Sequence, residues 1–297
     1  MEKIKRTFGF ILTHPLGKRH VARCLLNFLI WQSQSNLYPT KLIIKHFIKP
    51  VRFYARKGLT GLTGNIYTGL HEFDDMMFLL HLLRAGDTFF DIGANAGSYT
   101  LLASGVCKAN SVALEPVNAA FEILDKNVIL NSLQSRVCAI NAAAGAKKGT
   151  ITFTADQDTT NHVLAGTERG TENVVSVPVI TVDSLTDNQQ PVLIKIDVEG
   201  YETEVLKGMA DTLDHTLLKA IIIELNGSGA RYGFSDNDIH SLLLSKKFSP
   251  YVYDPFKRSL IKTQTFGVSN TIYCRDWDFV NDRLQAADPV GVMGELI

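Results

Sequence analysis

The sequence has few cysteines and no long apolar run. Its four cysteines are widely spaced and form no CxxC pair, which excludes a disulfide scaffold and favours small core thiols in a reducing compartment. The best apolar stretch, residues 21–31, is interrupted by Arg23 and Asn27 and is too short to cross a bilayer. A signal peptide with an apolar region and a cleavage site is not evident either. We therefore expect a cytoplasmic protein.

Neither sign of charge is in excess, because 30 Lys/Arg balance 30 Asp/Glu, and this balance does not favour a nucleic-acid-binding protein. The distribution is uneven. Residues 1–70 contain 12 bases and one acid, Glu2, whereas the other 227 residues contain 18 bases and 29 acids. A basic arm on an acidic body is typical of contact with an anionic surface or substrate, but a solvated helical face gives the same pattern.

The basic arm is expected to be mainly helical. Apolar residues recur at three- and four-residue steps over 20–34, which predicts an amphipathic helix. The basic and apolar stretch at 41–54 is interpreted as a further helix, and the glycine-rich segment 57–65 as a loop. We therefore predict two domains, a basic helical N-terminal extension at 1–65 and a larger domain at 66–297.

Short apolar runs alternate with helical patterns after residue 70. Alternation of this kind predicts an open, mainly parallel, Rossmann-like sheet with helices on both faces. An inserted β-pair is expected at 149–154 and 174–182, and late strands, antiparallel to the others, at 250–253 and 271–274. The five expected core strands are residues 88–92, 111–114, 137–141, 192–196 and 220–224.

The first strand runs into a loop of small residues. Asp91 ends the strand, and Gly93 and Gly97 allow a ligand to approach the backbone closely. Asn95 stands where the dinucleotide fingerprint requires glycine, which disfavours a nicotinamide dehydrogenase. An acid at the mouth of the loop suits a ligand with a positive amino group better than one with phosphates.

The second strand ends in Glu115 and Pro116. Glu115 follows Gly93 by 22 residues, close to the spacing of roughly 20 at which an acid accepts hydrogen bonds from ribose hydroxyls. We therefore interpret Glu115 as a ribose ligand.

Charged side chains gather at the ends of the fourth and fifth strands as well. Lys195, Asp197 and Glu199 alternate onto one side of an extended chain, and Glu224 and Asn226 end the next strand. Three charges in a row on one face of an apolar strand favour a functional site. A salt-bridged strand end is the structural alternative.

The chain contains FDIGANAGSYT at 90–100, then Glu115-Pro116, and then IKIDVEGYE at 194–202 with VLKG at 205–208. The two long motifs in this order resemble the FkbM family of S-adenosylmethionine-dependent methyltransferases, over about residues 66–275. The resemblance implies a class I fold with a mainly parallel seven-stranded sheet, a ribose contact from Glu115, and adenine contacts from Asn141 and Ala142. The residues that would surround the methionine part of the cofactor are Asp91, Gly93, Asn95 and Gly97.

The family typically methylates hydroxyl groups of small molecules or sugars, so we expect a small-molecule or glycan acceptor. Because an alcohol is a poor nucleophile, a base or a metal must assist. One hypothesis makes Asp197 the general base, with Lys195 tuning its charge and Glu199 and Glu224 beside it. Another makes Asp197, Glu224 and Asn226 ligands of a divalent ion such as Mg²⁺. His162 is a third candidate base.

Other functions stay open at this stage. A methyltransferase-like protein that binds the cofactor without turnover has the same motifs, and so does an N-methyltransferase. Methylation of DNA is not expected, because the body is acidic and the chain has no Asn-Pro-Pro-aromatic tetrapeptide. Residues 1–55 could hold the protein peripherally against an anionic membrane or an anionic glycan, or pack on the acidic body as a helical lid or a dimer contact.

Overall fold

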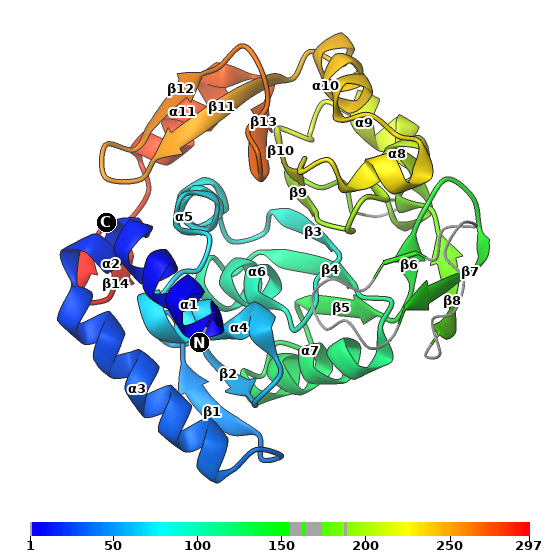
Figure 1. The fold of residues 1–297 in the computed structure, drawn as a ribbon. Coiled ribbons are helices and arrows are strands. Elements are labelled where there is room, and N and C mark those ends of the chain that lie inside the picture. The colour runs from blue at the N-terminus through cyan, green and yellow to red at the C-terminus, as the bar shows by residue number, and fades with distance from the viewer. Residues whose placement is uncertain (1, 155–161, 164–173, 187–188) are drawn as a thin grey trace.

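The computed structural model describes residues 2–154, 162–163, 174–186 and 189–297 (Figure 1). The inserted region that includes residues 155–161 and 164–173 lies outside this description except for two residues, His162 and Val163.

The central element is an eight-stranded sheet with the order β12-β11-β13-β10-β9-β3-β4-β5. The five strands from β10 to β5 are parallel, β13 runs antiparallel to both of its neighbours, and β12 runs antiparallel to β11. The mainly parallel sheet is confirmed. It has one strand more than expected because β12 folds back on β11. The strands are β3 Thr88–Ile92, β4 Asn110–Leu114, β5 Val137–Ile140, β9 Leu193–Ile196, β10 Ala220–Glu224, β11 Ser249–Asp254, β12 Ser259–Lys262 and β13 Asn270–Cys274.

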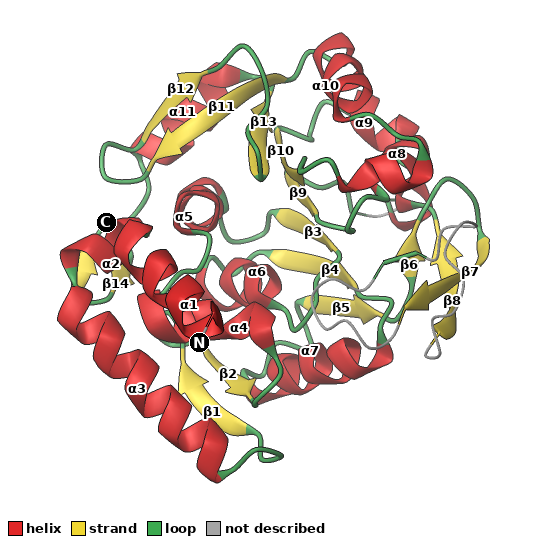
Figure 2. Cartoon of the chain, viewed as in Figure 1, coloured by secondary structure: helices red, strands yellow, loops and turns green. Residues whose placement is uncertain are grey.

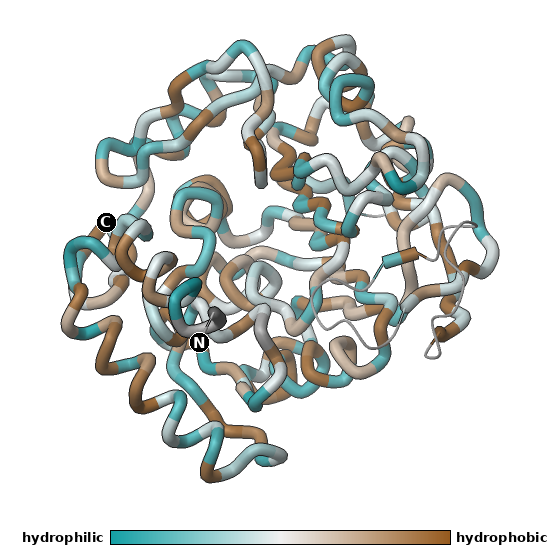
Figure 3. Tube along the Cα trace, in the orientation of Figure 1, coloured by the Kyte–Doolittle hydropathy of each residue, from teal (hydrophilic) through white to brown (hydrophobic). Residues whose placement is uncertain are grey.

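Helices cover both faces of this sheet (Figure 2). Successive strand residues point to opposite faces, so Phe89 and Phe90 enter different apolar clusters. Both faces are apolar, and β10 is mostly hydrophobic along its length (Figure 3). One face is covered by α5 Phe73–Leu82, α6 Ser98–Leu101, a π-helical turn Leu102–Val106, α7 Asn118–Leu130 and α11 Trp277–Gln285, and the other by α8 Glu202–Lys207, α9 Ala210–Asp214 and α10 Asp236–Ser245.

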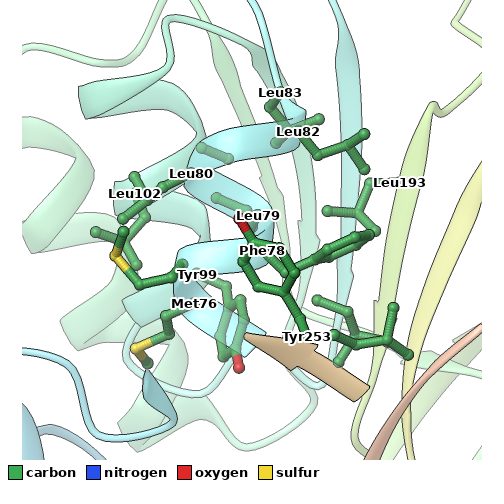
Figure 4. Packing of buried hydrophobic residues seen from close by; sticks show 14 of the residues in the cluster. Met76, Phe78, Leu79, Leu80, Leu82, Leu83, Tyr99, Leu102, Leu193 and Tyr253 are labelled. Carbon is green, nitrogen blue, oxygen red and sulfur yellow. The ribbon is translucent and has the colours of Figure 1, made fainter. Parts of the chain in front are cut away.

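Helix α5 is the most enclosed of the covering helices (Figure 4). Its apolar side chains pack between the sheet and α6, and Phe78 meets Tyr253 edge to face with ring centroids 5.6 Å apart. This packing fixes the start of α5, where Glu72 precedes the helix at the edge of the cavity described below.

The N-terminal extension differs from its expected form in two places. Residues 41–54 are not helical: β1 Ile43–His46 and β2 Arg52–Ala55 form a hairpin, since the alternating burial of β1 and the proline at position 50 both oppose a helix. The glycine-rich segment is not wholly a loop, because α4 Thr60–Thr68 begins inside it. Burial of Leu62 and Tyr67 outweighs the low helix propensity of glycine there.

The extension shares its core with the rest of the chain. Phe28 and Phe53 belong to one cluster with Leu101 and Leu124 of the larger domain. The expected boundary at residue 65 falls within α4. The other helices of the extension are α1 Glu2–Thr13, α2 Pro15–Arg19 and α3 Val21–Leu37.

The C-terminal end of the chain lies beside α2 (Figure 1). A short hairpin of β14 Gly291–Val292 and β15 Glu295–Leu296 brings Glu295 to Arg19, with 2.9 Å between Oε1 and Nε. Arg23 also donates to the backbone oxygen of Met293. The C-terminus therefore fastens the extension to the body.

The inserted β-pair is present as part of a small sheet with the order β6-β8-β7. Its strands are β6 Ala143–Ala144, β7 Gly149–Thr154 and β8 Val174–Ile180. Among the described residues, no helix is both long and apolar enough to cross a membrane.

We predict that Phe53→Ala destabilises the whole protein. Phe53 is fully buried in the shared cluster, and removing a buried phenylalanine side chain costs about 3–5 kcal/mol. Urea unfolding followed by circular dichroism measures this loss. The control is Leu29→Ala on exposed α3 surface (61% exposed), which should change stability by less than about 0.5 kcal/mol. A Phe53→Ala protein as stable as the wild type would contradict the shared core.

Candidate active site

A cavity of about 900 Å³ opens at the carboxyl ends of the central strands. Ligands bind at this edge in open α/β sheets, and the volume lies within the range of small-molecule sites. The loops after β3, β4, β9 and β10 form one side of the cavity, and α1, α3 and α4 form the other.

The β3 loop is held in place by Asp91. Its Oδ2 accepts hydrogen bonds from the backbone nitrogen and the hydroxyl of Thr100, at 3.0 and 2.6 Å, and so ties the strand end to α6. Burial raises the pKa of Asp91 to about 6. Asp91 lines the cavity, although its carboxylate is mostly enclosed.

The two glycines of this loop have different surroundings. Gly93 lines the cavity with φ +85°, and a Cβ there would lie 1.8 Å from the backbone oxygen of Asp197. Gly97, with φ +90°, packs against Leu124 and is not among the cavity-lining residues. Asn95 lines the cavity and uses its side-chain oxygen to accept from the nitrogen of Ala96.

Glu115 closes the same loop from the end of β4. Its two carboxylate oxygens accept from the backbone nitrogens of Asn95 and Val117, both at 2.8 Å. Burial raises the pKa of Glu115 to about 7. Asn141 donates to the backbone oxygen of Glu115 and so positions the turn after β4. Ala142 lines the cavity itself.

A buried ion pair lies at the centre of the site. The Nζ atom of Lys195 is 2.7 Å from Oδ2 of Asp197 and 4.9 Å from the centre of the Tyr99 ring. Burial opposes the charge of Lys195, but Asp197, Glu72 and Asp91 outweigh it and raise its pKa above the usual value. Lys195 is therefore a permanent cation, and in the described part of the chain it is the one donor to the Asp197 carboxylate.

Two further acids, Glu199 and Glu224, converge on Asp197 of this pair. One carboxylate oxygen of Asp197, one of Glu199 and one of Glu224 lie within 4.8 Å of one another. Burial and the neighbouring Asp197 raise the pKa of Glu199 to about 7 and of Glu224 to about 8. Oε2 of Glu224 is buried with no hydrogen-bond partner among the described residues.

The expected strand alternation does not explain this convergence. Strand β9 ends at Ile196, and Glu199 is directed by a turn in which its own φ is +54°. Asn226 is exposed and is not among the described residues that line the cavity, and its side-chain oxygen accepts from the backbone nitrogen of Ser228. His162 is buried beside β7 and is not among the described residues that line the cavity.

A polar network that the sequence reading missed supports the site from α5 and β13. The Tyr99 hydroxyl donates to Glu72, and the amide of Asn270 donates to Glu72 and to Asp75. Burial and Glu72 raise the pKa of Asp75 to about 7. The sequence signal for this network is weak, because Glu72 and Asn270 are ordinary residues for the start of a helix and the start of a strand.

The site fits a cationic nucleoside ligand. On the strand side, the lining contains six acids and one base. Burial and neighbouring acids raise the pKa values of Asp91, Glu115, Glu199 and Glu224. These shifts record lost hydration and repulsion that a bound cation relieves. Gly93 leaves the loop open, and the Glu115 oxygens each retain a lone pair for a ribose hydroxyl. The six acids are Glu72, Asp91, Glu115, Asp197, Glu199 and Glu224.

A family model described as "Methyltransferase FkbM domain" matches residues 91–250, which is more than half of the chain. The chain belongs to the FkbM methyltransferase family. It is an S-adenosylmethionine-dependent methyltransferase, and the expected family, fold class and methyl donor are confirmed.

Among curated proteins, this methyltransferase is similar to the hexuronic acid methyltransferase AglP of Haloferax volcanii. The two are 29% identical over 182 residues, which cover 60% of this chain and 70% of AglP. Solved structures resemble it more distantly. An rRNA methylase from Streptococcus thermophilus has a TM-score of 0.40, with 10% identity over 67% of this chain and 91% of that one. TrmK of M. capricolum in complex with S-adenosyl-homocysteine has a TM-score of 0.37, with 13% identity over 67% and 66%.

The raised pKa of Glu224 predicts how stability varies with pH. Its pKa is about 8 in the folded protein and near 4.5 when exposed. Between these values the folded state binds more protons than the unfolded state, so this group makes stability fall as pH rises from about 4.5 to 8. We predict that Glu224→Gln lessens the fall, with a higher Tm than the wild type at pH 8.

Thermal unfolding followed by circular dichroism at pH 5 and pH 8 measures this difference. The matched control is Glu122→Gln on exposed α7 surface, which should leave the pH dependence unchanged. A Glu224→Gln protein whose Tm declines as steeply as that of the wild type would show that Glu224 does not bear the extra proton.

Proposed function

We propose that this methyltransferase moves the methyl group of S-adenosylmethionine to a hydroxyl oxygen of a sugar or another small molecule. The observation that carries the proposal is the Asp197 carboxylate, which lies in the cavity beside the Gly93 loop with one oxygen paired to Lys195. The name of AglP, which gives a hexuronic acid as its substrate, supports a sugar acceptor. When bound, the sulfonium supplies an electrophilic methyl group for in-line displacement.

The residues proposed to hold the cofactor form the rim of the β3 and β4 loops. Asp91, Gly93 and Asn95 would surround the methionine part, and Glu115 would bind the ribose. Ala142 would contact the adenine. Gly97 and Asn141 would support these residues without touching the cofactor, since Gly97 packs on Leu124 and Asn141 donates to the backbone oxygen of Glu115.

We predict that Glu115→Gln weakens cofactor binding by about tenfold to a hundredfold. A hydrogen bond to a charged acceptor contributes about 1.5–3 kcal/mol, and each 1.4 kcal/mol is about a factor of ten in affinity. Isothermal titration with S-adenosylhomocysteine provides the measurement, and Glu122→Gln again serves as the control. Equal affinities for the three proteins would remove Glu115 from the cofactor site.

Asp197 is proposed to act as the general base. Lys195 fixes one of its oxygens and balances its charge, and the other oxygen is left to accept the proton of the acceptor hydroxyl as the C–O bond forms. Glu199 and Glu224, with pKa values near 7 and 8, lie within reach to pass that proton toward solvent. The walls of the cavity exclude water and align the acceptor, and alignment alone can contribute about 7–11 kcal/mol.

We predict that Asp197→Asn lowers kcat by about 10²–10⁴-fold, the usual contribution of general-base catalysis, with little change in S-adenosylhomocysteine affinity. Release of S-adenosylhomocysteine in the presence of a hydroxylated acceptor measures turnover. Asp238→Asn on exposed α10 is the control. Full turnover by Asp197→Asn would overturn both the base mechanism and the metal mechanism.

A divalent ion is the competing mechanism. It would bind the acceptor oxygen directly through Asp197 and Glu224. Asn226, the third ligand expected from the sequence, is exposed and is not among the described lining residues, whereas Glu199 lies beside the two acids. Loss of turnover after treatment with EDTA, restored by Mg²⁺, would favour the ion, and turnover that resists EDTA would leave Asp197 as the base.

Two other functions are separated by the same assay. A cofactor-binding protein without turnover would release no S-adenosylhomocysteine with any acceptor. An N-methyltransferase would release it with amines and not with alcohols. We also keep, as a proposal, a cytoplasmic location with peripheral contact of residues 1–55 with an anionic membrane or an anionic glycan.

A further inference from the structure

The charges that line the cavity are separated by sign. The wall formed by α1, α3, α4 and the segment before α4, here called the N-terminal wall, contributes two bases and no acid among the described lining residues. The strand side contributes six acids and one lysine. A cavity divided in this way offers a cation and an anion different places to bind.

No ion pair neutralises the two bases of the N-terminal wall among the side chains that the structure describes. Arg6 lies on α1, and no described acid forms an ion pair with it. Lys57 donates to the neutral side-chain oxygen of Asn36 at 2.8 Å. Both side chains belong to exposed residues at the mouth of the cavity, so each can turn toward a ligand.

Helix α3 contacts both elements that carry these bases. Phe8 of α1 packs against Phe28 with ring centroids 5.7 Å apart, which places α1 at this point of α3. Lys57 is held at Asn36, eight residues further along. The two anchor points are therefore about 12 Å apart at the 1.5 Å rise of a helix.

Polar and aromatic side chains occupy the wall between these two points. Trp31 and Gln32 of α3 line the cavity there, and Gln32 donates to the Tyr67 hydroxyl. Phe10 adds a second aromatic side chain from α1. Aromatic side chains with a polar tip or neighbour suit ligands that are apolar on one face and polar at the edge, as sugar rings are.

We propose that the N-terminal wall is the acceptor subsite and that it selects a sugar bearing an anionic group, a carboxylate or a phosphate, through Arg6 and Lys57. The inference rests on the proposed sugar O-methylation and adds a specificity that Asp197 and the cofactor loops do not supply. The cationic cofactor occupies the acidic side, and the anionic acceptor occupies the basic side. The two ligands then meet where Asp197 lies.

The test compares matched acceptors that differ only in charge. Glucosides, galactosides and mannosides are assayed beside their uronic acids and their 6-phosphates, with S-adenosylhomocysteine release as the readout. We expect kcat/KM to favour the anionic members by about tenfold or more, mainly through KM. Carboxylate and phosphate members identify which anion the wall prefers.

The variants are Arg6→Gln and Lys57→Gln, singly and together. The double variant should lose the preference for anionic acceptors while keeping kcat/KM for neutral acceptors and the affinity for S-adenosylhomocysteine. The matched control is Lys41→Gln, because Lys41 is an exposed base of the same extension that stacks on Tyr38 outside the cavity.

The outcomes separate this inference from the proposed function. Absence of turnover with every sugar overturns sugar methylation itself, and the inference with it. Turnover with equal rates for neutral and anionic sugars, or a preference that the double variant retains, overturns the subsite alone. A double variant that keeps its selectivity but loses binding to phosphatidylglycerol vesicles would make this surface a membrane contact instead.

Discussion

One buried ammonium group organises the active site. Lys195 is 3% exposed and lies among Asp91, Glu72 and Asp197, which come from three different parts of the chain. A lone charge at this depth would be very unfavourable, and so would this many acids without a cation. The Lys195–Asp197 pair therefore makes the convergence of acids tolerable, and it holds Asp197 at the carboxyl end of β9. The acidity that remains on the strand side is the property that suits a cationic methyl donor.

The second constraint is the shared core of the extension. Because Phe28 and Phe53 are buried with residues of the larger domain, α1 and α3 cannot act as an independent arm. Their packing closes the cavity on the side opposite the strands and brings Trp31 to its wall. Two of the bases in residues 1–70, Arg6 and Lys57, therefore line the cavity, and other bases lie on the outer surface. A region that the sequence presents as an appendage therefore contributes one wall of the cavity.

The reach of sequence reasoning differed between elements for physical reasons. The sheet strands were found because burial on both faces requires continuous apolar runs, and the β3 and β4 loops were found because a glycine loop and a strand-ending acid have a recognisable spacing. The hairpin at 43–55 and helix α4 were misjudged, since in each case contacts with distant residues outweighed local propensity. Glu72, Asp75 and Asn270 were overlooked because they meet only through the packing of α5 against the sheet.

The sequence by itself determined the family, the class of fold, the methyl donor and the loops that were assigned to it, because these depend on motifs that are contiguous along the chain. The tertiary structure decided which charges share one cavity. It turned Glu199 toward Asp197 and Glu224, left Asn226 exposed and outside the described cavity lining, and set Arg6 and Lys57 along the opposite wall. Such choices depend on turn geometry and on helix packing between residues far apart in the chain, and neither leaves a local pattern to read.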